Sequence, residues 1–168
     1  FDPSVQPLWA LWAERVSAGT RPSSAELSAA RARGHWSDLQ LDAQEIRMAP
    51  GMGLTLNGIA QGFIADRVAD LLSAEGLTNI LIDTGEHRAL GQMPGGGDWP
   101  ISLAQGGKVP LRSRALATSA PLGTTFDSNG TLGHILDPQT GAPTGSRWQA
   151  ISMSAPSAAL ADGLSTAG

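Results

Sequence analysis

The sequence predicts an α+β fold in which short strands alternate with at least three helices. Several segments carry apolar residues at the 3.6-residue spacing of an amphipathic helix, and shorter segments alternate apolar and polar residues between glycine- and proline-containing turns. This combination is typical of mixed short-stranded sheets packed with helices. With 168 residues and 41% hydrophobic content the chain is long enough for one core, so we expect a single domain over residues 1–168.

Two helices are predicted near the N-terminus. Residues 7–16 place their apolar side chains at helical spacing, with a proline in the first turn where its missing N–H costs nothing. Ser23 or Ser24, followed by Glu26, has the pattern of a helix N-cap, and Gly34 is expected to end this second helix.

The clearest amphipathic helix is expected over residues 63–72, with an apolar face made of Phe63 or Ile64 together with Val68, Leu71 and Leu72. Gly58 and Gly62 precede or open it. Such a loop can present backbone N–H groups and the positive helix end to a phosphate, although many loops use two glycines for purely structural reasons. Both interpretations stay open from this segment alone.

Strands are predicted where short apolar runs lie between turns, at residues 39–41, 45–48, 79–82, 99–103, 116–119 and 150–154. Thr118 and Ser119 end one of them. Hydroxyls at a strand end are candidate ligand contacts, and the alternative is that they bond to local backbone.

His134 stands out because it lies in a stretch dense in polar and turn-forming residues, 132–141. The apolar pair after it suggests the end of a buried strand, and Asp137-Pro138 begins a turn. A histidine at that junction can act as a base near neutral pH, since its ordinary pKa is about 6.5. Taken alone, the residue is better explained as a structural histidine bonded to the turn.

The C-terminal segment predicts a helix over residues 158–167 that gathers oxygen ligands. Asp162 and Thr166 are four residues apart and so share one helical face, with Ser165 beside them. Magnesium prefers hard oxygen donors of this kind, completed by phosphate oxygens and water. The alternative is a solvent-facing aspartate with a threonine bonded to its own helix.

The composition excludes several function classes. Charged residues make up 15% of the chain, the net charge is −4, and no Lys/Arg cluster is present, which disfavours nucleic-acid binding. The absence of cysteine excludes disulfides and thiolate chemistry. No apolar run approaches the roughly 18 residues of a membrane span. The chain starts at Phe1 without a methionine or a signal sequence, which suggests a processed or trimmed chain, and loss of a targeting segment is compatible with this start.

Five motifs, taken in order, resemble those of the ApbE family of FAD:protein FMN transferases. The family patterns DxTVGPLxxLW, DLGGIAKGYxxD, ATSG, HIIDPxTGxP and ADxLSTA correspond to residues 2–12, 55–66, 117–120, 134–143 and 161–167. The match covers nearly the whole chain. It implies two T-fold-like halves of sheet and helix, with FAD in the cleft between them.

The resemblance also implies an activity and a set of site residues. Members cleave FAD in the presence of Mg²⁺, release AMP and attach FMN to a threonine of an acceptor flavoprotein, usually a subunit of a respiratory redox complex. His134 is then the candidate base. The metal ligands are the Gly58 carbonyl, Asp162 and Thr166, with Ser165 as a neighbour. FAD-binding positions fall on Leu11, Trp12, Thr55, Gln61 and Ile135. Typical members are periplasmic, or anchored to the membrane facing the periplasm.

Some features depart from the family pattern. Thr55, Gln61, Glu86 and Ala120 replace the residues usual at their positions, and the family's N-terminal segment is expected to be missing from this chain. Two alternatives to the transferase therefore stay open. One is an Mg²⁺-dependent FAD pyrophosphatase that produces free FMN and AMP, and the other is a degenerate FAD-binding module without catalysis.

Overall fold

The computed structural model of the protein describes residues 1–145 and 147–168 and confirms an α+β architecture. Its contacts group the chain into two compact units, each built from separate segments. We call them the sheet unit, which is Phe1, Asn57–Ser119 and Ala150–Gly168, and the helix–loop unit, which is Asp2–Leu56 and Ala120–Gln149.

The sheet unit is built on a four-stranded sheet with the order β3-β4-β7-β8. Every strand pair that the structure describes is antiparallel, whereas mixed sheets were expected. Short turns join β3 to β4 and β5 to β6, and a tight hairpin allows only antiparallel pairing. The strands are β3 (Ile80–Asp83), β4 (His87–Leu90), β7 (Ala115–Ser119) and β8 (Ile151–Ala155), with a separate hairpin of β5 (Trp99–Ser102) and β6 (Lys108–Leu111). The sequence analysis did not predict β4 or β6.

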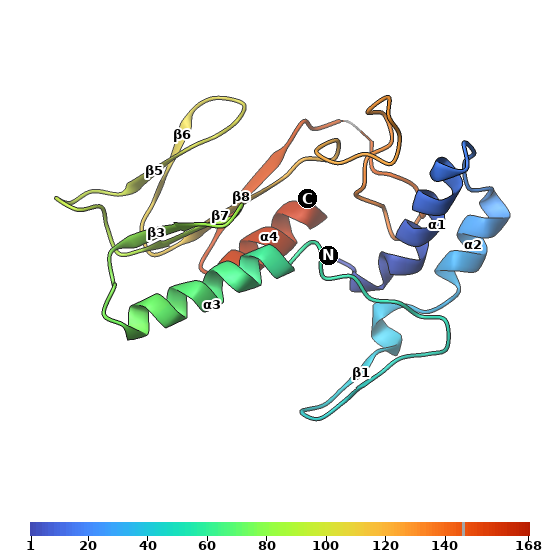
Figure 1. Ribbon diagram of the computed structural model, residues 1–168, viewed down its shortest axis with the longest axis horizontal. Helices are drawn as coiled ribbons and strands as arrows, with labels where there is room; N and C mark the ends of the chain where they lie inside the picture. Colours follow the sequence, from blue (N-terminus) through green and yellow to red (C-terminus); the bar gives the residue numbers. More distant parts are fainter. Residues whose placement is uncertain (146) are drawn as a thin grey trace. The chain divides into compact units, whose positions relative to one another are not determined.

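Two helices pack on this sheet, α3 (Ala60–Ala74) against β3 and β4, and α4 (Ala158–Ala167) against β7 and β8 (Figure 1). The core between them is made almost entirely of alanine, with buried Ala65, Ala115, Ala117, Ala155, Ala158 and Ala161. Small side chains let the backbones approach closely. A Cβ atom on Gly62 would lie 2.3 Å from the Ala158 carbonyl oxygen, so only glycine fits there.

The predicted apolar face of α3 was wrong. Phe63, Ile64 and Leu71 are more than half exposed, and the buried positions are Gly62, Ala65 and Ala69. The helical period was right, but the contact with α4 needs the narrow stripe of small residues. The predicted free N–H groups were also wrong at Gly62, whose amide donates to Asp162.

The helix–loop unit contains two short helices, two short strands and long turns. The helices are α1 (Gln6–Ser17) and α2 (Ser24–Arg31), the strands are β1 (Gln40–Leu41) and β2 (Ile46–Arg47), and 3₁₀ turns cover Pro3–Val5 and Trp36–Asp38. Ser23 and Glu26 form the predicted capping box of α2. The core contains Leu8, Trp12, Ala30 and Leu136.

The strand predicted just before the Asp-Pro turn is absent from the described residues around His134. Only isolated bridges form there, between Thr125 and Gly133 and between Leu136 and Pro143. Proline has no N–H to extend the second bridge into a ladder. No described helix is long and apolar enough to cross a membrane.

Candidate functional site

The candidate site in the sheet unit is centred on Asp162, which is 5% exposed on α4. Its Oδ2 accepts a hydrogen bond of 3.0 Å from the backbone N–H of Gly62, in the first turn of α3. Burial raises the pKa of the Asp162 carboxyl, and the Gly62 bond opposes that rise. A buried carboxylate with one backbone partner is stabilised further by any cation that binds beside it.

Three hydroxyl groups, one from β7 and two from α4, lie close together where β7 ends. The Ser119 Oγ lies 2.8 Å from the Ser165 Oγ and 3.2 Å from the Thr166 Oγ1, so the end of β7 meets the last turn of α4. The Ser165 hydroxyl also donates to the Asp162 carbonyl at 3.0 Å. The helical spacing recognised in the sequence therefore places Asp162, Ser165 and Thr166 together, and Ser119 joins them.

Gly58 lies beside this cluster. It is buried, and a Cβ atom at this position would lie 3.0 Å from Thr166 Cγ2 and 2.7 Å from the ring of Phe1. The oxygen donors of this part of the sheet unit are the Asp162 carboxylate and the Ser119, Ser165 and Thr166 hydroxyls, which are hard oxygens suited to Mg²⁺. The described residues hold no cluster of three or more His, Cys, Asp or Glu side chains that could bind a metal. A site here would combine one carboxylate with hydroxyl and backbone oxygens, and this donor set fits Mg²⁺.

Glu86 is a buried carboxyl that the sequence analysis noted only as a departure from the family pattern. It is 7% exposed, and its Oε2 accepts the Thr118 N–H at 3.1 Å. The pKa of Glu86 is raised to about 7, mainly by burial and next by the negative charge of Asp162. The hydrogen bond from Thr118 lowers the pKa, and the charge of Asp83 raises it by a smaller amount. The position of an acidic residue directly after the Gly85 turn is the sequence feature that could have identified Glu86 as a candidate site residue.

Two further predicted residues lie in the sheet unit. The Thr118 Oγ1 is 2.8 Å from the Ser152 Oγ on β8, so this hydroxyl already has a partner within the sheet. Gln61, in the first turn of α3, has its amide nitrogen 3.0 Å from where a Cβ would stand at Gly85. Gly85 has a φ of +100°, a conformation that favours glycine. Gln61 therefore packs on the turn that carries Glu86.

His134 belongs to the helix–loop unit and is half-buried. Its Nδ1 lies 2.9 Å from the Thr124 carbonyl oxygen, which only accepts hydrogen bonds. Nδ1 must therefore carry the proton, and in the neutral ring Nε2 is left as the basic nitrogen. The turn after it is fixed by Asp137, whose Oδ1 accepts the Gln139 N–H at 2.8 Å and whose Oδ2 accepts the Thr140 hydroxyl at 3.0 Å.

The other predicted flavin-binding residues also lie in the helix–loop unit. Trp12 is 6% exposed, and its ring N–H donates to the Gly141 carbonyl at 2.7 Å, so the indole is part of the core. The Thr55 N–H donates to the Pro3 carbonyl at 2.8 Å, and the Ile135 carbonyl accepts the Thr144 N–H at 2.8 Å. Leu11 is half-buried and packs against the core cluster.

The chain is similar to known proteins over its whole length. The profile of the ApbE family matches residues 1–168, the whole chain. The chain belongs to the ApbE family. It is 31% identical over 180 residues to the FAD:protein FMN transferase of Vibrio cholerae, a match that covers 99% of this chain and 54% of that protein. It is also 31% identical over 150 residues to the FAD:protein FMN transferase of Klebsiella pneumoniae, covering 85% of this chain and 48% of that one.

Solved structures of ApbE proteins match the fold. The apo crystal structure of the Pseudomonas stutzeri flavinyl transferase ApbE aligns with a TM-score of 0.84 at 34% identity, covering 99% of this chain and 55% of that one. The ApbE protein of Thermotoga maritima aligns with a TM-score of 0.86 at 29% identity, covering 99% and 58%. The chain thus spans about half the length of the ApbE relatives it matches.

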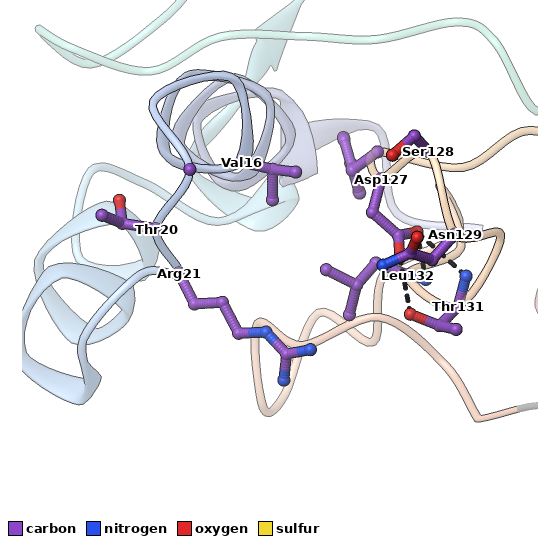
Figure 2. A pocket seen from close by; sticks show the side chains of 10 residues that line it. Val16, Thr20, Arg21, Asp127, Ser128, Asn129, Thr131 and Leu132 are labelled. Atoms are coloured by element: carbon purple, nitrogen blue, oxygen red, sulfur yellow. Dashed lines mark hydrogen bonds between the residues drawn. The ribbon is translucent and has the colours of Figure 1, made fainter.

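The helix–loop unit of this ApbE protein also contains a cavity of about 490 Å³ (Figure 2). Val16, Phe126 and Leu132 contribute apolar lining, and Figure 2 shows the Arg21 side chain extending along one side. Asp127 also lines the cavity. Its carboxylate accepts hydrogen bonds from the Thr131 hydroxyl, the Leu132 N–H and the Thr131 N–H, and these lower its pKa. This carboxylate therefore stabilises the loop that lines the cavity.

Proposed function

We propose that this protein transfers FMN from FAD to a threonine of an acceptor flavoprotein, with Mg²⁺ bound and AMP released. The relatives named FAD:protein FMN transferase support the reaction class. The observation that carries the proposal is the oxygen cluster of the sheet unit, in which Asp162, Thr166 and Ser119 meet beside Gly58. Their chemistry suits a pyrophosphate bound through a divalent cation.

Asp162, Thr166 and the Gly58 carbonyl would hold the ion, with Ser165 as a neighbouring hydroxyl. Only Oδ2 of Asp162 is engaged by the Gly62 N–H, which leaves Oδ1 as a donor. When bound, Mg²⁺ neutralises pyrophosphate charge and stabilises the charge that develops on the transferred phosphoryl group. The Ser119 and Ser165 hydroxyls are hydrogen-bonded to each other, and this bond keeps the last turn of α4 against the end of β7.

The proposed chemical step is a phosphoryl transfer with His134 as general base. The acceptor threonine oxygen attacks the phosphorus of the FMN half, the bond from that phosphorus to the oxygen bridging to AMP breaks, and AMP leaves with the bonding electrons. The threonine proton passes to His134 Nε2, which is the basic nitrogen because Nδ1 donates to Thr124. The remaining flavin contacts are proposed on Leu11, Trp12, Thr55, Gln61, Thr118 and Ile135.

The acceptor is proposed to be a subunit of a respiratory redox complex, and the place of action the periplasm, as in typical family members. These two points are supported by membership of the family. A threonine-bearing acceptor is what separates this reaction from simple hydrolysis of FAD.

The test is to mix the protein with FAD, Mg²⁺ and a threonine-bearing acceptor peptide, and to follow AMP by chromatography and the peptide by mass spectrometry. Parallel samples contain EDTA, or a peptide in which valine replaces the threonine. We expect AMP and an FMN-sized adduct in the full mixture only. AMP without an adduct would establish the pyrophosphatase, and bound FAD with neither product would establish a degenerate binding module.

A further inference from the structure

We infer that Asp66 is a positioning residue that sets the register of α4, which carries Asp162 and Thr166 of the cation site, against α3. The inference rests on the proposed function, because it concerns the site formed by Gly58, Asp162 and Thr166. Asp66 lies on α3, eight residues after Gly58. The proposed reaction assigns no role to this residue.

The carboxylate of Asp66 binds the start of α4. Its Oδ1 accepts the Ala158 N–H at 2.8 Å and its Oδ2 accepts the Ala159 N–H at 2.9 Å. These are the first two residues of α4, whose N–H groups have no partner within the helix. A negative charge at this end is also favoured by the helix dipole. Asp66 therefore attaches the N-terminus of α4 to α3.

The two helices run antiparallel with three matched levels, each four residues from the next. Asp66 meets Ala158, Gly62 meets Asp162 through its N–H, and Gly58 lies beside Thr166. The middle level is reciprocal to the first, since here α4 supplies the carboxylate and α3 the N–H. A shift of α4 at the Asp66 level therefore also moves Asp162 relative to Gly62 and Thr166 relative to Gly58, because Ala158, Asp162 and Thr166 belong to one continuous helix.

Asp66 does not act merely by forming α4. Ser157 already caps that helix, its Oγ accepting the Leu160 N–H at 3.2 Å. The Ser157 cap is local and leaves the position of α4 on α3 undetermined. What Asp66 adds is the connection of α4 to α3, and a cation held by α4 and by the Gly58 turn that precedes α3 depends on that connection.

Arg88 on β4 completes the arrangement. Its Nε lies 3.0 Å from Asp66 Oδ1, with both side chains less than a fifth exposed. The contact is an ion pair without hydrogen-bond alignment, since Arg88 Nε has no hydrogen-bond partner among the described residues. The guanidinium therefore lies beside the carboxylate that accepts the two N–H groups of α4.

The test compares Asp66→Asn with Asp70→Asn, a matched control one turn further along α3. Asp70 is exposed and pairs only with Arg67 on the surface. Asparagine at position 66 can accept through one atom only, so one N–H of α4 loses its partner. Because this variant also leaves Arg88 unpaired, Arg88→Met and the double variant Asp66→Asn/Arg88→Met are measured beside it.

The first readout is the affinity for Mn²⁺, measured by electron paramagnetic resonance on the FAD-bound protein, and the second is the Mg²⁺ dependence of AMP release. We expect Asp66→Asn and the double variant to bind Mn²⁺ about 10-fold more weakly, in the range of outer-shell substitutions. Their half-saturating Mg²⁺ concentration should rise by a similar factor, with the rate restored at high Mg²⁺. Asp70→Asn should match the wild type, and Arg88→Met, which keeps both N–H contacts of Asp66, should lie closer to the wild type than to Asp66→Asn.

An unchanged Mn²⁺ affinity in the folded double variant would overturn the positioning role. So would a lower maximal rate with an unchanged half-saturating Mg²⁺ concentration, because that pattern reports a smaller folded fraction. Failure of the proposed function is distinguishable from both, since the wild-type protein itself would then release no AMP, and a wild type that also bound no Mn²⁺ would overturn both proposals.

Discussion

Gly62 is the position where the structure makes its sharpest prediction about stability. A Cβ atom built there lies 2.3 Å from the Ala158 carbonyl oxygen, 2.6 Å from the Ala158 carbonyl carbon and 2.8 Å from Ala159 Cα. All three are backbone atoms, so α4 has to move away from α3 in a Gly62→Ala variant. That movement also lengthens the bond from the Gly62 N–H to Asp162.

Overpacking of this kind costs about 1–3 kcal/mol. A hydrogen bond to a charged group contributes about 1.5–3 kcal/mol, part of which is lost. Alanine is about 1 kcal/mol better than glycine inside a helix, which offsets some of the cost. We therefore expect Gly62→Ala to lower the free energy of unfolding by about 1–4 kcal/mol.

The assay is urea denaturation followed by circular dichroism, with Gly163→Ala as the control. Gly163 lies within α4, and a Cβ atom there has nothing within 4 Å. The control should raise the free energy of unfolding by about 0.5–1 kcal/mol through helix propensity alone. If Gly62→Ala is as stable as the control, the close approach of the two helices described above is refuted.

Three further predictions follow from single contacts. Because the pKa of Glu86 is raised from 4.5 to about 7, the neutral acid is favoured by folding; the extra stability is fully present below pH 4.5 and is lost as the pH rises to about 7. Urea titrations across that range should therefore show the wild type losing up to about 3 kcal/mol relative to Glu86→Gln, and a constant difference would contradict the raised pKa. His134→Ala should slow FMN transfer roughly 10²–10⁴-fold while FAD binding is retained, and full transfer in the mass assay would exclude His134 as the base. Ser23→Ala removes the side-chain cap of α2 and should cost about 1 kcal/mol in a thermal melt, whereas an unchanged melting temperature would show that the cap adds no stability.

The features that the sequence predicted correctly depend on residues close together in the chain. The capping box joins Ser23 to Glu26, three residues away, and the helix that carries Asp162 and Thr166 was predicted over residues 158–167, where the structure has it. A helical period or a cap needs no knowledge of the rest of the fold. For the same reason the helices were placed within a few residues of their observed ends.

The features that the sequence did not predict depend on contacts between distant segments. Phe63 and Leu71 give α3 an apolar face, yet the packing distance to α4 selects the small residues on another side. The hydrogen bond between Asp66 and Ala158 joins residues 92 positions apart, so the role of Asp66 follows only from the packing of α4 against α3. Glu86 likewise has its partner on β7, 32 residues away. Neither carboxyl lies in a local pattern that indicates its partner.

The most direct test of the central claim is the transfer reaction of Asp162→Asn measured beside Asp70→Asn, both with FAD, Mg²⁺ and the acceptor peptide. Asp162 supplies the only carboxylate of the proposed cation site, whereas Asp70 pairs with Arg67 at the surface. We expect Asp70→Asn to form AMP and the FMN adduct at the wild-type rate, and Asp162→Asn to form neither while remaining folded. Wild-type transfer by Asp162→Asn would contradict the assignment of the cation site to α4.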